Sequence, residues 1–277
     1  MGNIRVLASS LFALTTLVAC GDDGGAITIV DSGIVDAPPI DSAPPIDQPP
    51  PIEYDFSCFG NQPGTVAKAV TISGTAQEVY LAGTAPGIRA VADAAIKVCT
   101  GDCEGDNELA ALDPTGATGV FTTDAIPTAG AALPLYLSAT RTGDLPTLLF
   151  PHTDVTSDVS DVPLLLVQSS LLQFLTFIGI TQDPANGVVV VAVTDCSAGL
   201  QGVTGAVVEV TQGGNPVGDD PLDAGAFDPM GAGVYLITNM PPGATLVTAT
   251  MGTQGFLDND VTVAAGTVTA AQVRPGY

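Results

Sequence analysis

The sequence has no tryptophan, one histidine, and only 6 lysines and arginines in 277 residues. Because 29 acids give a net charge of −23, the phosphates of a nucleic acid would repel the chain, and nucleic-acid binding is excluded. The single histidine, His152, has no nucleophile signature such as G-x-S-x-G to act on, so we interpret it as a surface residue. We therefore expect no catalytic residues and a protein that is not an enzyme.

Charge of either sign is also scarce, at 13% of residues, whereas glycine (32) and proline (22) are abundant. A helix-rich enzyme would contain more Glu, Lys, Arg and Leu, which are strong helix formers. Turn-forming residues spaced among Val, Thr and Ala instead indicate short strands connected by tight turns. The composition predicts an all-β protein.

The apolar run at residues 6–18, about 13 residues, is too short to span a bilayer as a helix but fits the core of a signal peptide. It ends in Leu17-Val18-Ala19-Cys20, which resembles the lipobox of bacterial lipoproteins. The resemblance implies cleavage between Ala19 and Cys20 and attachment of lipid to the Cys20 thiol. Because Gly21 rather than Asp follows the cysteine, it implies an outer membrane lipoprotein that faces the periplasm or the cell surface. The alternative is an ordinary secretory signal that ends beside an unrelated cysteine.

Residues 20–55 carry acids but no lysine or arginine, and they contain a six-residue proline repeat with Ile40, Ile46 and Ile52 at equivalent positions. Polyproline II has three residues per turn, so this repeat places the three isoleucines on one edge. Proline stiffness and like-charge repulsion both extend such a segment. We expect a disordered, extended tether. The alternative is a docking ligand for a PxxP-type groove, although such ligands usually carry basic residues.

From residue 56 onward, short β-prone runs replace the proline repeat. We expect a first set of strands at 69–73, 95–99, 119–123, 134–140, 147–150 and 163–167, and a second set at 187–193, 206–210, 233–238, 244–250 and 260–263. Three pieces of the first set align with the second: residues 91–98 (VADAAIKV) with 203–210 (VTGAVVEV), 119–121 (GVF) with 233–235 (GVY), and 138–140 (SAT) with 248–250 (TAT). The alignment predicts two copies of one β-sandwich unit.

The second copy resembles the carboxypeptidase regulatory-like domain through a set of spaced residues: Val203, Gly205, Ala206, Val208, Val210, Gly233, Tyr235, Pro241, Pro242, Gly243, Gly252 and Phe256. That family has an Ig-like, transthyretin-like sandwich and is grouped with starch-binding-like modules. The resemblance implies a fold more than a function, because such motifs recur in many functional settings. Residues 64–167 match the pattern more loosely.

These features predict two β-sandwich units joined by a short helix and preceded by a signal peptide and a tether. The expected boundaries are a signal peptide at 1–19, lipidated Cys20 with the acidic linker at 20–55, a first sandwich at 56–167, a helical connector at 168–186, and a carboxypeptidase regulatory-like sandwich at 187–277.

The connector is expected to be an apolar helix. Ser170 and Gln173 fit a capping box, and Leu171, Phe174 and Leu175 share one face. Since so apolar a helix would not remain free in water, we expect it to wedge between the two sandwiches. A transmembrane span over residues 163–180 is the alternative, which polar residues near its middle and missing basic flanks disfavour.

Four cysteines follow Cys20, and three complete pairings are possible in an oxidising compartment. Cys99 ends an expected strand and the next residues can turn the chain back, so Cys99–Cys103 is the favoured disulfide. Cys58–Cys196 would then tie the start of the first unit to the second. The acidic loops at 102–108, 219–228 and 258–260 are interpreted as solvated turns, with weak calcium binding as the alternative, so no metal and no cofactor is expected.

The sequence thus predicts a membrane-anchored lipoprotein that displays non-catalytic β-sandwich modules, for binding or structure, at the cell envelope. Its partners would be the lipid bilayer, through lipidated Cys20, and an envelope protein or polysaccharide. A carbohydrate-binding lipoprotein with a starch-binding-like fold is the first alternative. Sugar sites usually present aromatic platforms, however, and this chain has no tryptophan and only 5 tyrosines. An enzyme of unrecognised type is the second.

Overall fold

The computed structural model describes residues 53–61, 64–82, 85–177, 179–226 and 231–276. The chain separates into two compact units, residues 1–50 and 51–277, and the second is called the body below. The expected signal peptide, the lipidation site Cys20, its neighbour Ala19 and residues 20–52 of the linker lie outside the described residues.

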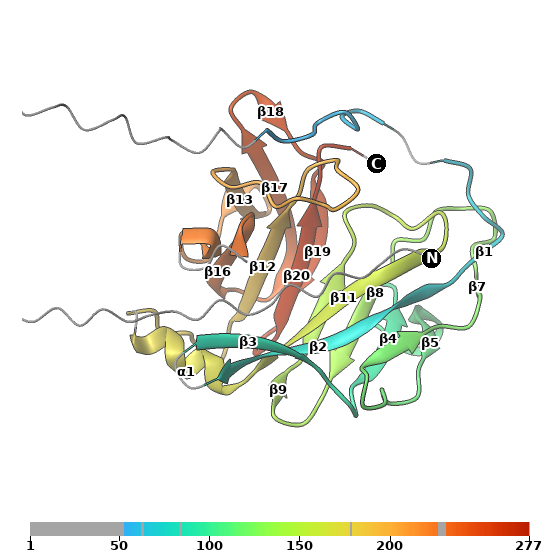
Figure 1. Cartoon of the computed structure of the whole chain (residues 1–277), viewed down its shortest axis with the longest axis horizontal. Helices are drawn as coiled ribbons and strands as arrows, with labels where there is room; N and C mark the ends of the chain where they lie inside the picture. The colour runs from blue at the N-terminus through green and yellow to red at the C-terminus, as the bar shows by residue number, and fades with distance from the viewer. Residues whose placement is uncertain (1–52, 62–63, 83–84, 178, 227–230, 277) are drawn as a thin grey trace, which may run out of the picture. The chain divides into compact units, whose positions relative to one another are not determined.

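The described part of the body is almost wholly β, as the composition predicts (Figure 1). We call residues 64–168 the first sandwich; its strands are β1 (Ala69–Val70), β2 (Ile72–Ala82), β3 (Ala85–Ala90), β4 (Ala95–Cys99), β5 (Glu108–Ala111), β6 (Val120–Thr122), β7 (Ile126–Pro127), β8 (Tyr136–Thr140), β9 (Asp144–Leu145), β10 (Thr147–Phe150) and β11 (Val159–Gln168). Helix α1 (Ser170–Phe177) follows. We call residues 187–276 the second sandwich; its strands are β12 (Gly187–Val193), β13 (Val207–Gln212), β14 (Asn215–Pro216), β15 (Leu222–Asp223), β16 (Val234–Met240), β17 (Gly243–Met251), β18 (Gln254–Gly255), β19 (Asn259–Val263) and β20 (Val268–Val273).

The two sandwiches share one sheet. Its eight strands run in the order β15-β16-β12-β20-β10-β8-β4-β5, so four come from each sandwich. The join is a parallel pairing of β10 with β20, from Thr147 opposite Val268 to Phe150 opposite Ala271. A second sheet in each sandwich, β3-β2-β11-β9 or β14-β13-β17-β18, completes the fold. The two sandwiches therefore form one hydrogen-bonded body.

Each face of the shared sheet carries a different hydrophobic core. Side chains alternate along a strand, so Tyr136 and Phe150 belong to the core of the second sandwich, whereas Leu137 and Leu149 belong to that of the first. The rings of Tyr136 and Phe150 stack with their centroids 4.8 Å apart. Strands β8 and β10 thus supply both cores at once.

The two sandwiches repeat one topology, as the sequence alignment predicts. The first long strand is parallel to the last strand in each, β2 to β11 and β12 to β20. In the strand pairs β4–β8 and β13–β17, Ile96 lies opposite Ala139 and Val208 lies opposite Ala249. These residues are equivalent in the alignment, so the internal repeat is confirmed at the level of strand register.

The turn that precedes β4 and its counterpart before β13 also match. Asp93 and Gly205 occupy the same place in the repeat, and both adopt left-handed backbone with φ of 61° and 75°. This conformation is available to glycine and, among other residues, mainly to Asn and Asp. The glycine of the aligned pattern is therefore a requirement of the turn rather than of a ligand.

A buried hydroxyl fastens each of these turns, but a different residue supplies it. Tyr235 accepts a hydrogen bond from the Ala206 N–H at 2.9 Å and donates to the Val203 carbonyl at 3.3 Å. In the first sandwich, the Thr115 hydroxyl accepts from the Ala94 N–H at 3.1 Å and donates to the Val91 carbonyl at 2.8 Å. The same backbone groups are satisfied in both copies, although Phe121 replaces Tyr235 in sequence.

Helix α1 is not the wedge expected from the sequence. It packs on β2 and β11 of the first sandwich, and Leu171 and Leu175 are only half-buried (Figure 1). The expectation is wrong because the two sandwiches meet directly, through β10 and β20, and leave no gap for a helix to fill. Among the described residues, no helix is long and apolar enough to cross a membrane.

The connector after α1 is held by Asn239 at the end of β16. The Asn239 amide nitrogen donates to the Thr181 carbonyl at 2.9 Å, and its oxygen accepts from the Asp183 N–H at 2.7 Å. Its backbone N–H donates to the Gln182 side-chain oxygen at 2.9 Å. Residues 181–183 are thereby fixed to the second sandwich.

We predict that Tyr235→Phe and Thr115→Val each lower the free energy of unfolding by about 1–3 kcal/mol, because each leaves a buried N–H without its acceptor. Tyr136→Phe is the matched control, since its hydroxyl bonds the carbonyl of Gly101 in an exposed turn that water can solvate. Urea denaturation measures all three. Equal stability of Tyr235→Phe and Tyr136→Phe would contradict the role given to the buried hydroxyl.

Candidate functional site

The end of the linker docks on the second sandwich rather than on the first. We call residues 53–58 the strap. The hydroxyl of Tyr54 lies 2.7 Å from the Thr204 hydroxyl and accepts from the Thr204 N–H at 3.1 Å. Phe56 meets the ring of Phe256 edge to face, with centroids 6.0 Å apart. Both aromatic side chains of the strap pack against the core of the second sandwich.

Asp195 is the polar anchor of the strap. Its side chain is 1% exposed, and its Oδ2 accepts from the Asp55 N–H at 3.0 Å. Its Oδ1 accepts from the backbone N–H groups of Ser197 and Gln201, both at 3.0 Å, and from the Ser197 hydroxyl at 2.6 Å. Burial raises the pKa of Asp195, but these hydrogen bonds outweigh it and the pKa is lowered. The carboxylate stays ionised and shapes the loop that receives the strap.

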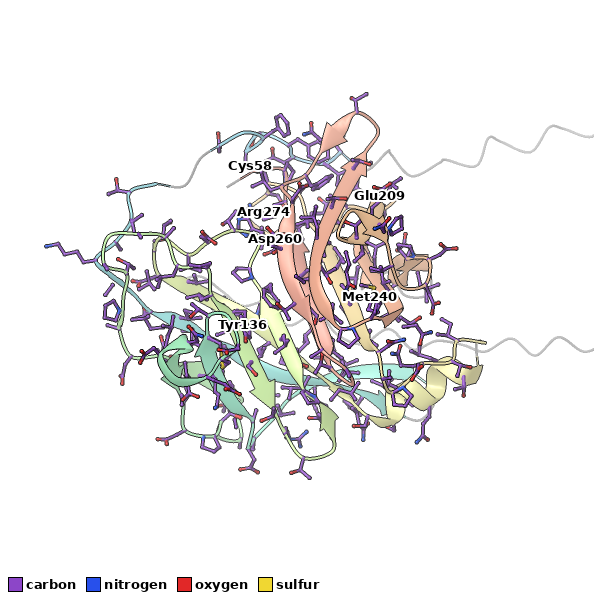
Figure 2. All side chains as sticks on the ribbon, turned by 180° about the vertical axis from the view of Figure 1, so that it is seen from behind. Cys58, Tyr136, Glu209, Met240, Asp260 and Arg274 are labelled. Atoms are coloured by element: carbon purple, nitrogen blue, oxygen red, sulfur yellow. A yellow bond between two sulfur atoms is a disulfide. The ribbon has the colours of Figure 1, made fainter. Side chains whose placement is uncertain are left out.

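A disulfide closes the strap covalently. Cys58 is bonded to Cys196, with Cα atoms 5.5 Å apart, and the Cys196 N–H donates to the Asp55 carbonyl at 2.7 Å. Gly276 lies so close to the carbonyl of Cys58 that any side chain there would overlap it. Figure 2 shows Cys58 near Arg274, two residues before this glycine. The start and the last described residues of the body therefore meet at one joint.

The expected linker boundary at residue 55 needs correction. Tyr54 and Asp55 are placed in the linker by the sequence, yet both make specific contacts with the second sandwich. The signal was available in the two aromatic residues, Tyr54 and Phe56, that end the proline repeat just before Cys58. Asp195 gave no comparable signal, because nothing in the sequence shows that an aspartate beside a cysteine is buried.

The second disulfide joins Cys99 to Cys103, the pair favoured from the sequence. It closes the turn after β4, where the Cys103 N–H donates to the Thr100 carbonyl at 3.1 Å. Because the closed loop is so short, the bond constrains few residues of the unfolded chain. We assign it to the local turn.

A cluster of four charged side chains in the first sandwich combines two buried carboxylates, Glu78 and Asp144, with a partly exposed and an exposed arginine. Glu78, whose side chain is 3% exposed, lies 2.6 Å from Arg89 and 3.2 Å from Arg141. Arg141 also lies 3.0 Å from Asp144, and the Arg89 guanidinium lies 4.4 Å from the centre of the Tyr80 ring. Three of the four ion pairs in the described part of the chain belong to this cluster.

The cluster lowers the pKa of the Glu78 carboxyl and raises the pKa of the Asp144 carboxyl. Burial raises the pKa of Glu78, but hydrogen bonds from Arg89 and with Asp144 and the charges of the arginines lower it overall. Burial and the Glu78 charge raise the pKa of Asp144 against the pull of Arg141. These ion pairs join the β2–β3 hairpin to the β8–β9 turn, so we assign the cluster a structural role.

Carboxylates in the acidic loops 102–108 and 219–228 accept hydrogen bonds from within the protein. Asp219 accepts from Thr238 and from Asn239, each at 2.6 Å, at the edge of a cavity of about 460 Å³. Asp102 accepts from the Asn107 amide at 2.7 Å. In the ranges that the structure describes, no three His, Cys, Asp or Glu side chains are grouped so as to hold a metal ion.

His152 is half-buried rather than on the surface, because it follows β10 at the contact between the sandwiches. There the Asn259 amide donates to the Pro151 carbonyl and to the Gln272 carbonyl, both at 2.9 Å. Burial, and after it the positive charge of Arg274, lowers the pKa of His152 from 6.5 to about 4. The imidazole is neutral in the folded protein at neutral pH.

No family model matches the chain. No curated protein matches it. Among solved structures, it is similar to GBS52, the minor pilin of Streptococcus agalactiae, with 12% identity, coverage of 75% of this chain and 96% of that chain, and a TM-score of 0.25. It is also similar to the shaft pilin SpaA of Lactobacillus rhamnosus GG, with 12% identity, coverage of 76% and 98%, and a TM-score of 0.24. A third similar structure is the TIE protein of Bacillus anthracis, with 10% identity, coverage of 77% of this chain and 41% of that chain, and a TM-score of 0.25. TM-scores this low support no conclusion about ligand, activity or assembly.

The lowered pKa of His152 predicts an acid-sensitive component of stability. Between pH 6.5 and about 4 the unfolded chain binds a proton that the folded protein does not, so stability falls as the pH drops through that window. The full shift would correspond to about 3 kcal/mol, which partial exposure of the ring reduces to about 1–2 kcal/mol. His152→Gln should remove this component, as measured by urea denaturation at pH 7 and pH 4.5. Parallel pH profiles for the two proteins would show that the prediction is wrong.

Proposed function

We propose that the chain is a membrane-anchored lipoprotein that holds a non-catalytic pair of β-sandwiches at the cell envelope, as a structural or binding module. The lipobox-like residues Leu17-Val18-Ala19-Cys20 and the acidic, proline-rich linker support anchoring and spacing. Cys20 would carry the lipid, and Gly21 supports delivery to the outer membrane.

The observation that carries the proposal is the strap. A linker that only separates two parts needs no contact with either, whereas here its end is held by the buried carboxylate of Asp195 and by the Cys58–Cys196 disulfide. A covalent joint at the entry of the body suits a segment that transmits the pull of an anchor. The fused sheet suits the same role, since it prevents the two sandwiches from moving independently.

We predict that Cys20→Ser abolishes lipidation and leaves an uncleaved precursor, because the thiol that would receive the lipid is gone. Labelled palmitate and detergent-phase partitioning of the full chain test this. Multiple acyl chains hold a protein on a membrane far more firmly than one, so wild type should partition almost completely into detergent. The double variant Cys99→Ser/Cys103→Ser is the control and should remain labelled. An unlabelled wild type would refute the anchor.

The partner class is tested separately, by crosslinking in cells and by a glycan array probed with the full chain in detergent. Chemical crosslinking in intact cells should recover an envelope protein, whereas a glycan array should give no retention. Specific retention of a glycan would replace the proposal with the carbohydrate-binding alternative.

A further inference from the structure

The Cys58–Cys196 disulfide encloses the first sandwich in a covalent loop. The two cysteines are 138 residues apart in sequence. Between them lie all strands from β1 to β11, the helix α1 and the strand β12. Strands β13 to β20, which complete the second sandwich, lie outside the loop.

Without that bond, a pull on the linker would reach the first sandwich through a very short strand once the contacts of the strap had separated. The chain leaves the strap and next enters β1, which has two residues and pairs only with β7 in a two-stranded sheet. Tension at this point would separate Ala69 and Val70 from their partners and then load β2. Short strands with few hydrogen bonds open at low cost compared with the interior of a sheet.

With the bond, the same pull reaches Cys196, three residues after the end of β12. Strand β12 lies between β16 and β20 in the shared sheet, so it is hydrogen-bonded on both sides. Val189, Val191 and Val193 of this strand are fully buried. The disulfide therefore connects the linker to one of the best-supported strands of the body.

We infer that the Cys58–Cys196 disulfide is a load shunt: it passes tension from the linker to β12 and protects the first sandwich from being extended. The inference rests on the proposed function in one respect, because the linker is under tension only if Cys20 is anchored. The load path itself is a property of the body and does not depend on lipid.

Force spectroscopy on the full chain tests the inference, with one handle inserted in the linker after Asp47 and the other after Tyr277. In the oxidised protein only residues 48–57 and the residues beyond Cys196 can extend, which releases about 310 Å of chain. A dithiol reductant, itself oxidised to a disulfide, converts Cys58–Cys196 to two thiols. Reduction should add about 480 Å for the 138 residues of the opened loop.

The double variant Cys58→Ser/Cys196→Ser should give the reduced trace without reductant and should begin to extend at lower force. Cys99→Ser/Cys103→Ser is the matched control: its bond lies inside the loop, so its oxidised trace should equal that of wild type. Reduction of already folded wild type guards against a double variant that does not fold.

Release of the full length by oxidised wild type would overturn the load shunt, as would equal extension of oxidised and reduced protein. These outcomes are separate from the lipidation test. If Cys20 carries no lipid but the oxidised protein releases only the shorter length, the proposed function fails and the load path stands.

Discussion

The alternation of side chains along β8 and β10 is the constraint on which the body depends. Tyr136 and Phe150 complete one core, and their neighbours Leu137 and Leu149 complete the other. A slip of one residue in either strand would exchange the two sets and disrupt both cores together. The core of the second sandwich is incomplete without Tyr136 and Phe150 of the first. The parallel pairing of β10 with β20 brings these two rings to it and makes the two repeats a single body.

Much of the fold could be predicted from the sequence, because the repeat preserved both the strands and their register. Every expected strand overlaps an observed one, and Asp93 and Gly205 mark the same turn. The strand that joins the sandwiches, Val268–Val273, was missed. It is enclosed by strands on both sides and packed on both faces, so its small residues show no alternation of polar and apolar positions.

The candidate site was predictable only in part, for a related reason. The cysteine spacing pointed to Cys99–Cys103 and left Cys58–Cys196 as the remaining pair, but a cysteine pattern gives no information about what surrounds the bond. The docking of Tyr54, the buried carboxylate of Asp195 and the approach of Gly276 to Cys58 all join residues far apart in sequence. Together they convert the end of a proline-rich linker into a fixed joint, and they connect that joint to the shared sheet through β12.

Native-state hydrogen exchange of wild type and Ala271→Asp tests the single-body architecture most directly. Ala271 is 2% exposed and lies between Phe150 and Val191 in the shared sheet, so an aspartate there would bury an unpaired charge at a cost of several kcal/mol. The slowest amides of both sandwiches should lose protection by the same amount, whereas Ala198→Asp in an exposed loop should change neither. Loss of protection in the second sandwich alone, with the first unchanged, would contradict the shared sheet.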